Sequence, residues 1–231
     1  MKLKTLLAGI FLLMFSCFAN VIENDLAKNN SIQTRIDNIG ADLLNMNKIT
    51  KRVVFAYNDK DKKRMLDIYD ELTKRQVVIY GDKYKFVESD DELAAMLGYE
   101  IALILKSYSG MWGGRIDSIQ VWVSPKKFEV ASDKRAVDFM VKAGYNPLGL
   151  ITYIQKTCPQ KRTDKIGRSN LTSKRLAIIY EYITYKYPKY LDSIEYKNNK
   201  YYQNFLLTSL SNRSKLQEKI KTNSTKAIKY E

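Results

Sequence analysis

The chain has 231 residues, 45% of them hydrophobic and 28% charged, which excludes a disordered or low-complexity protein and allows one domain with a substantial core. The absence of histidine excludes every mechanism that needs a histidine base or a histidine metal ligand. The net charge of +14 favours acidic partners such as anionic lipids, envelope polyanions or acidic proteins, although a lysine-rich surface also serves solubility alone.

Residues 1–19 are predicted to be a signal peptide. Two lysines precede an apolar run over residues 6–15, and small side chains at Cys17 and Ala19 suit cleavage after Ala19. This run is shorter than the roughly 20 apolar residues that cross a membrane. We therefore expect an exported protein of the periplasm or cell envelope, with no nucleic-acid partner. Lipidation of Cys17 is the alternative to cleavage after Ala19, because the preceding residues resemble a bacterial lipobox.

An N-terminal helical region is predicted over residues 20–75, because apolar residues recur there at intervals of three and four, as on one face of a helix. A β-rich pattern replaces this period at residue 76. The helical positions are Ile32, Ile36, Ile39 and Leu43 in a first helix, and Met65, Ile68 and Leu72 in a second helix over residues 61–75.

A strand and a long helix follow. In QVVIYGDKYKFV, residues 76–87, a β-rich run meets a Gly-Asp turn and then an alternating run, so we expect a hairpin or strand-turn-strand. Ser89 is a good N-cap, and Glu92 three residues later completes a capping box. The helix that they open is predicted to reach about Ser107.

Three further helices are predicted near residues 128–142, 147–157 and 172–187. Gly144 begins the break between the first two helices, because glycine commonly ends a helix. Pro188 stops the third.

The stretch SDDELAAMLGYEIALIL, residues 89–105, resembles the metal-binding helix of a zinc peptidase. Such a helix carries H-E-x-x-H, in which two histidines bind zinc and the glutamate polarises the attacking water. In this register the first histidine is replaced by Tyr99, the glutamate is Glu100 and the second histidine is replaced by Leu103. Leucine has no donor atom, and a phenol with a reference pKa of about 10 is rarely a zinc ligand.

Three ordered blocks make the chain similar to the zinc metalloendopeptidase family of the CAAX prenyl endopeptidase, HtpX and BepA. After the helix, FEVASD offers Glu129 and Asp133 where the family has its third ligand in E-x-x-A-D. The sequence AGYNP at 143–147 is the most specific match. The final block, SNLTSKR, keeps Arg175 but has Ser169 where the family has a distal histidine.

The resemblance implies an α+β, mainly helical fold with a zincin-like core over residues 76–195, in which a peptide substrate adds along the edge of a small β-sheet or hairpin. Since the replaced residues are the ones that carry chemistry, we interpret the chain as a catalytically inactive homologue, without a cofactor, that binds polypeptide or an envelope protein in the old cleft. Asp133 would then cap a helix or pair with Lys134, Arg135 or Arg175. The residues of the vestigial site are Tyr99, Glu100, Leu103, Glu129, Asp133, Ser169 and Arg175.

Two alternatives remain open. One is an active metalloendopeptidase with atypical ligands, in which Glu100 and Glu129 would hold zinc or a harder ion. The other is a basic adaptor of the envelope surface. It would act through residues 196–231, predicted to be a basic helix followed by a solvated tail, whose net charge of +6 suits an anionic membrane surface.

Overall fold

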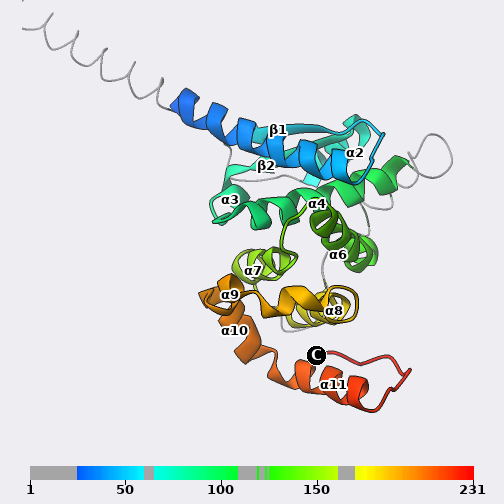
Figure 1. Ribbon diagram of the computed structural model, residues 1–231. Coiled ribbons are helices and arrows are strands. Elements are labelled where there is room, and N and C mark those ends of the chain that lie inside the picture. Colours follow the sequence, from blue (N-terminus) through cyan, green and yellow to red (C-terminus); the bar gives the residue numbers. More distant parts are fainter. Residues whose placement is uncertain (1–24, 60–64, 109–118, 120–122, 124, 161–169) are drawn as a thin grey trace, which may run out of the picture.

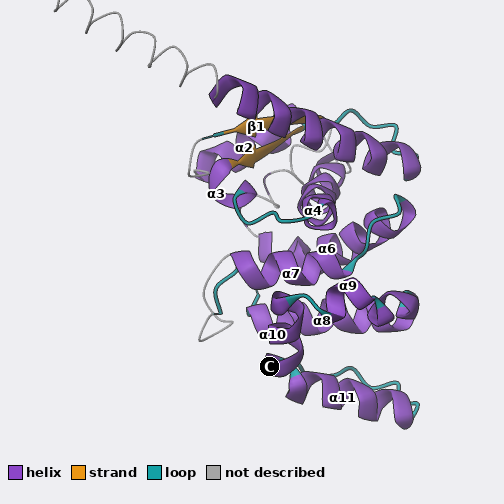
Figure 2. Ribbon diagram, turned by 60° about the vertical axis from the view of Figure 1, so that its left-hand side comes forward, coloured by secondary structure: helices purple, strands orange, loops and turns teal. Residues whose placement is uncertain are grey.

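The computed structural model describes residues 25–59, 65–108, 119, 123, 125–160 and 170–231, without the side chains of 65, 66, 68, 69 and 125. The predicted signal peptide, with Cys17 and Ala19, and the site residue Ser169 lie outside this description. The described chain is mainly helical with one small parallel sheet. Its elements stack in layers, from the first helix and the sheet at one end to α11 at the other (Figures 1 and 2). No helix among the described residues is both long and apolar enough to span a bilayer.

The first helix spans residues 25–46 and lies over the sheet (Figure 1). Its predicted apolar stripe, from Ile32 to Leu43, is buried in the main core. The second predicted helix is α2 (Met65–Lys74), where Leu72 is buried; the side chains of Met65 and Ile68 are outside the description. The period of three and four therefore located both N-terminal helices.

The sheet pairs β1 (Val54–Asn58) with β2 (Gln76–Tyr80) in parallel, and α2 forms the crossover between them. The predicted hairpin over 76–87 is wrong, because only its first half is a strand. Residues after β2 form the single-turn helix α3 (Gly81–Tyr84), and further turns closed by main-chain hydrogen bonds lead to Val87. The strand that pairs with β2 lies upstream, in a run of β-branched and aromatic residues that carried no hairpin signal.

The central helix α4 (Asp90–Tyr108) begins at the predicted cap. The Glu92 amide donates to Ser89 Oγ at 3.3 Å, while the Glu92 carboxylate accepts from the amide of Glu88 at 2.8 Å, one residue earlier than in a standard capping box. Most of α4 is buried, because it packs against β2, α6 (Pro125–Lys142) and α7 (Leu148–Thr157). This helix therefore forms the centre of the core.

The turn between α6 and α7 is the one that the sequence predicted. Gly144 has a φ of +87°, and the amide of Tyr145 donates to the Met140 carbonyl at 2.9 Å, which is the six-residue closure of a Schellman motif. Asn146 then accepts from the Leu148 amide at 3.0 Å and supports the start of α7.

The C-terminal helices are α8 (Thr172–Lys186), η2 (Pro188–Asp192), α9 (Ile194–Lys197), α10 (Lys200–Thr208) and α11 (Leu210–Lys221). Most of residues 221–229 are exposed, as predicted for a solvated tail, but the last two residues of the chain fold back onto α11. Tyr230 is buried, and the side chain of Asn212 exchanges hydrogen bonds of 3.0 and 3.2 Å with the main chain of Glu231. Apolar contact by Tyr230 therefore outweighs the polar composition of the segment.

Candidate functional site

A cavity of about 180 Å³ lies between β2, α4 and α7. Its volume is below the roughly 300–1,000 Å³ of sites for drug-sized ligands, so it suits one side chain better than a cofactor. Two of the predicted site residues on α4, Tyr99 and Glu100, line it, and so does Arg175 of α8. The principal lining residues are Val78, Met96, Tyr99, Glu100, Leu150, Tyr153, Ile154 and Arg175.

The outer edge of β2 borders this cavity. The Val54 amide donates to the Arg75 carbonyl at 3.1 Å, and bonding groups alternate along a parallel ladder, so Val77 and Ile79 face β1 while the main chain of Val78 faces outward. Val78 also lines the cavity. Among the described residues no strand pairs with this edge.

The outer edge of β1 is covered instead. Gln33 of the first helix donates to the Phe55 carbonyl at 3.3 Å and accepts from the Tyr57 amide at 2.6 Å. A side-chain amide thus occupies the hydrogen-bonding groups that an additional strand would use. The two edges of the sheet therefore differ, and the edge of β2 is the one placed beside a cavity.

An ion-pair cluster is centred on Arg175, which also lines the cavity. Arg175 of α8 donates through Nε and Nη2 to the two carboxylate oxygens of Asp133, both at 2.7 Å, and its Nη1 lies 3.3 Å from Glu129 Oε1. The guanidinium carbon lies 5.2 Å from the centre of the Tyr99 ring. Asn170 donates to Glu129 Oε2 from both its main-chain N–H and its side-chain Nδ2, at 2.7 Å each.

Burial and ion pairing shift the pKa values of Asp133, Arg175 and Tyr99 in this cluster. Burial raises the pKa of the Asp133 carboxyl, and the bidentate guanidinium opposes that rise. Burial alone would lower the pKa of Arg175, yet its contacts with Asp133 raise it well above the ordinary value. Burial raises the pKa of Tyr99, so its phenol stays neutral and is a poor metal ligand.

Four predicted site residues therefore meet: Tyr99, Glu129, Asp133 and Arg175. The predicted pairing of Asp133 with Arg175 is confirmed. Glu100 lies apart from the cluster, in the cavity wall, and Leu103 is buried in the core, where it has no donor to offer.

These residues do not fit a zinc ion. Catalytic zinc usually takes three protein ligands, whereas both oxygens of Glu129 are engaged by Asn170 or Arg175 and those of Asp133 by Arg175. Across the described part of the chain, no group of three or more Asp, Glu, Cys or His residues is placed to hold a metal. The alternative of atypical zinc ligands gains no support from this donor set.

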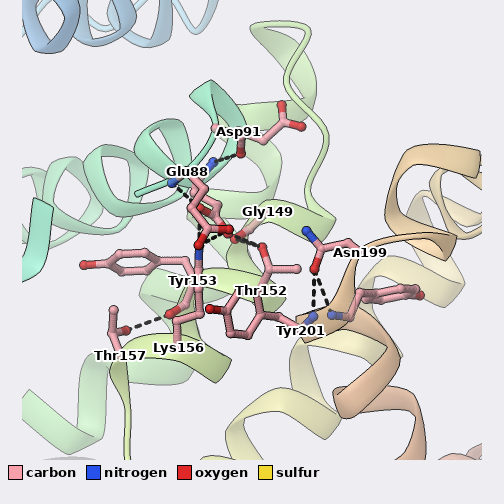
Figure 3. A network of polar contacts seen from close by, with 12 residues as sticks. Glu88, Asp91, Gly149, Thr152, Tyr153, Lys156, Thr157, Asn199 and Tyr201 are labelled. Atoms are coloured by element: carbon pink, nitrogen blue, oxygen red, sulfur yellow. Dashed lines mark hydrogen bonds and ion pairs between the residues drawn. The ribbon is translucent and has the colours of Figure 1, made fainter. Parts of the chain in front are cut away.

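A second polar network, which the sequence did not predict, joins α7 to α4 and α10 (Figure 3). Lys156 lies 2.6 Å from Glu92 Oε2, with both side chains 2% exposed, and its ammonium is 5.0 Å from the centre of the Tyr201 ring. Thr152 donates to Glu92 Oε1 at 2.8 Å. Lys156 follows Thr152 by four residues and so shares its buried face, which was the available signal.

The neighbouring acidic residues at the start of α4 are also engaged. Asp91 accepts from the Asn146 amide at 2.8 Å and from the Tyr196 hydroxyl at 2.9 Å, and Asp90 accepts from Arg35 Nε at 2.8 Å. The acidic start that matched the peptidase motif thus has a packing role in this chain.

Comparison with protein-family models, with curated proteins and with solved structures found no match. The likeness to zinc metalloendopeptidases therefore rests on the sequence blocks alone.

Proposed function

We propose that this protein is a non-catalytic polypeptide-binding protein of the cell envelope, built on a peptidase-like scaffold that has lost its metal site. The observation that carries the proposal is the outer edge of β2 beside the cavity that holds Glu100 and Tyr99. Arg175 pairs with Asp133 and with Glu129, the residue that the resemblance assigns as the third metal ligand.

Binding would proceed by β-augmentation, in which an extended segment adds a strand to a sheet edge. The outward main-chain groups of Val78 would bind the segment, and one of its side chains would enter the cavity. Since main-chain hydrogen bonds carry no sequence information, affinity would come from the edge and selectivity from the cavity.

A pair of proline substitutions tests this mode, because proline removes one amide donor from a strand. The amide of Val78 faces outward, so Val78→Pro should leave the fold intact and abolish binding of fluorescently labelled, unfolded casein. The control, Val77→Pro, removes a donor that faces β1 and should lower the melting temperature.

Three measurements separate the outcomes: casein binding, casein hydrolysis and melting temperature. The proposal would be supported if the parent protein binds casein without hydrolysing it and Val78→Pro abolishes that binding. Unchanged binding by the folded Val78→Pro protein would place the site elsewhere, and hydrolysis blocked by a chelator would favour an active metalloendopeptidase.

A second candidate function is attachment to an anionic surface through residues 196–231. The specific observation is that Leu207 and Leu210, at the junction of α10 and α11, are 76% and 63% exposed in a segment of net charge +6. Apolar side chains beside basic residues are typical of interfacial membrane contact. Three of the basic residues have acidic partners, which reduces the charge left for lipid: Lys197, Lys215 and Lys219.

A further inference from the structure

Glu100 is a carboxylate in the cavity wall that has no counter-ion among the residues that the structure describes. It lines the cavity together with Tyr99, its neighbour on α4, and Tyr153 of α7. Within the described chain it has neither a hydrogen bond nor an ion pair, whereas Glu129 and Asp133 are both engaged. An ionised group at a partly desolvated site gains most from a cation that reaches it.

Among the described residues, the charged side chains that line the cavity are Glu100, Lys83 and Arg175. The positive charge of Arg175 is engaged by Asp133 and Glu129, which lie outside the lining. Asp82 adds another carboxylate beside Lys83, and its Oδ1 is buried without a hydrogen-bond partner in the described structure. Asp82 and Glu100 both act electrostatically on Tyr153. The arrangement favours a cationic group over a neutral or acidic one.

The other walls suit the stem of a long basic side chain. Met96, Leu150 and Ile154 supply apolar surface, and the rings of Tyr99 and Tyr153 supply aromatic surface. Lysine and arginine bury aliphatic stems along apolar surface while the charged end seeks a partner, and aromatic faces attract cations. An apolar side chain in the same place would cover Glu100 and leave it unpaired.

We propose that the cavity receives one lysine or arginine side chain of the bound polypeptide, with its cation on the carboxylate of Glu100. This inference rests on the proposed function, since it names the selectivity of the same site. The glutamate that the resemblance assigns to water activation acquires a recognition role here.

Positional peptide libraries test the inference. Acetylated heptapeptides, each with one position fixed as Arg, Lys, norleucine or Glu and the others randomised, are measured against the full chain by fluorescence polarisation. We expect Arg and Lys at one position to bind roughly 10- to 100-fold more tightly than norleucine, which corresponds to one hydrogen-bonded charge pair. Glu at that position should bind more weakly than norleucine.

Glu100→Gln, which keeps the shape and removes the charge, should abolish the basic preference and should tighten norleucine binding, because norleucine then no longer covers an unpaired charge. The control is Glu218→Gln, the same change at an exposed position of α11, and it should behave as the parent protein. Melting temperatures show that each variant is folded. Glu100→Asp is the second variant, and should reduce the preference without abolishing it.

The outcomes separate the two proposals. A basic preference that survives in folded Glu100→Gln, or peptide binding with no basic preference, would overturn the role of Glu100 and leave polypeptide binding standing. Failure of every library, together with failure of casein, would overturn the proposed function itself. Saturable binding of Ca²⁺ alone that depends on Glu100 would show a metal site instead of a side-chain pocket.

Discussion

Replacing Arg175 by methionine tests whether the buried cluster is structural. The guanidinium holds both oxygens of Asp133 at 2.7 Å and lies 3.3 Å from Glu129, and all three side chains are at most 10% exposed. Methionine replaces the aliphatic stem but leaves two carboxylates buried without a cation. Breaking a buried ion pair from one side costs roughly 3–5 kcal/mol, a large part of the roughly 5–15 kcal/mol that holds a domain folded.

The assay is urea unfolding followed by circular dichroism, with thermal melting as a second readout. For a chain of this size the cost corresponds to a fall in Tm of roughly 6–20 °C. The pH dependence identifies the cause. In the variant, Asp133 has a native-state pKa above its unfolded value of about 3.9, because the charge is buried and unpaired. The native form therefore binds protons that the unfolded chain does not, and the destabilisation should shrink as pH falls from 7 towards 5.

A double variant supplies the control. Adding Asp133→Asn to Arg175→Met removes one of the two stranded charges, so it should recover part of the lost stability at pH 7 and flatten the dependence on pH. The reasoning is refuted if Arg175→Met costs less than about 1 kcal/mol, or if its cost is the same at pH 5 and pH 7.

The remaining predictions concern metal, two glycines and the C-terminal surface. The purified protein should hold less than about one-tenth equivalent of zinc, because three good donors are lacking; stoichiometric zinc after dialysis would contradict the proposed loss of the metal site. Gly144→Val should cost roughly 1–2 kcal/mol from its positive φ alone, since a β-carbon there meets nothing within 4 Å. Gly149→Ala should cost roughly 1–3 kcal/mol in urea unfolding, because its β-carbon would lie 2.7 Å from the main chain of Asp91. Equal stability to the parent would show that α4 and α7 can move apart without cost. The protein should co-sediment with anionic vesicles at low salt and dissociate from them as the salt concentration rises. The double variant Leu207→Ser, Leu210→Ser should bind these vesicles more weakly. Equal binding to neutral and anionic vesicles would show that the basic charge does not drive the attachment.

Local signals in the sequence predicted the helices well. The stripe from Ile32 to Leu43, the cap at Ser89 and the break at Gly144 each depend on residues close together in the chain, so period and capping chemistry were sufficient. The predicted partner of β2 was wrong, because the strand that pairs with it lies 22 residues upstream. No local sequence pattern encodes that register.

The candidate site was predicted in part for a similar reason. The sequence offered Arg175 as one of several basic partners for Asp133. The packing of α6 on α8 selects Arg175 from among them. The burial of Lys156 was not predicted, because a lysine in an amphipathic helix is usually solvated. Whether Glu100 is paired depends on where neighbouring cations lie in three dimensions, so the sequence alone could not show that its carboxylate lacks a partner among the described residues.

The three acidic residues that begin α4 have a consequence for local unfolding. Each contacts a part of the chain remote in sequence, so one helical turn links the first helix, α7 and α9 to the core. Because these links cross 55 to 105 residues, α9 cannot separate from the core without breaking its contact with α4, and α10 packs against both α9 and α7. Amide hydrogens of α10 should therefore exchange with the slow, global kinetics of α4, as one cooperative unit. The pairs are Asp90 with Arg35, Asp91 with Tyr196, and Glu92 with Lys156.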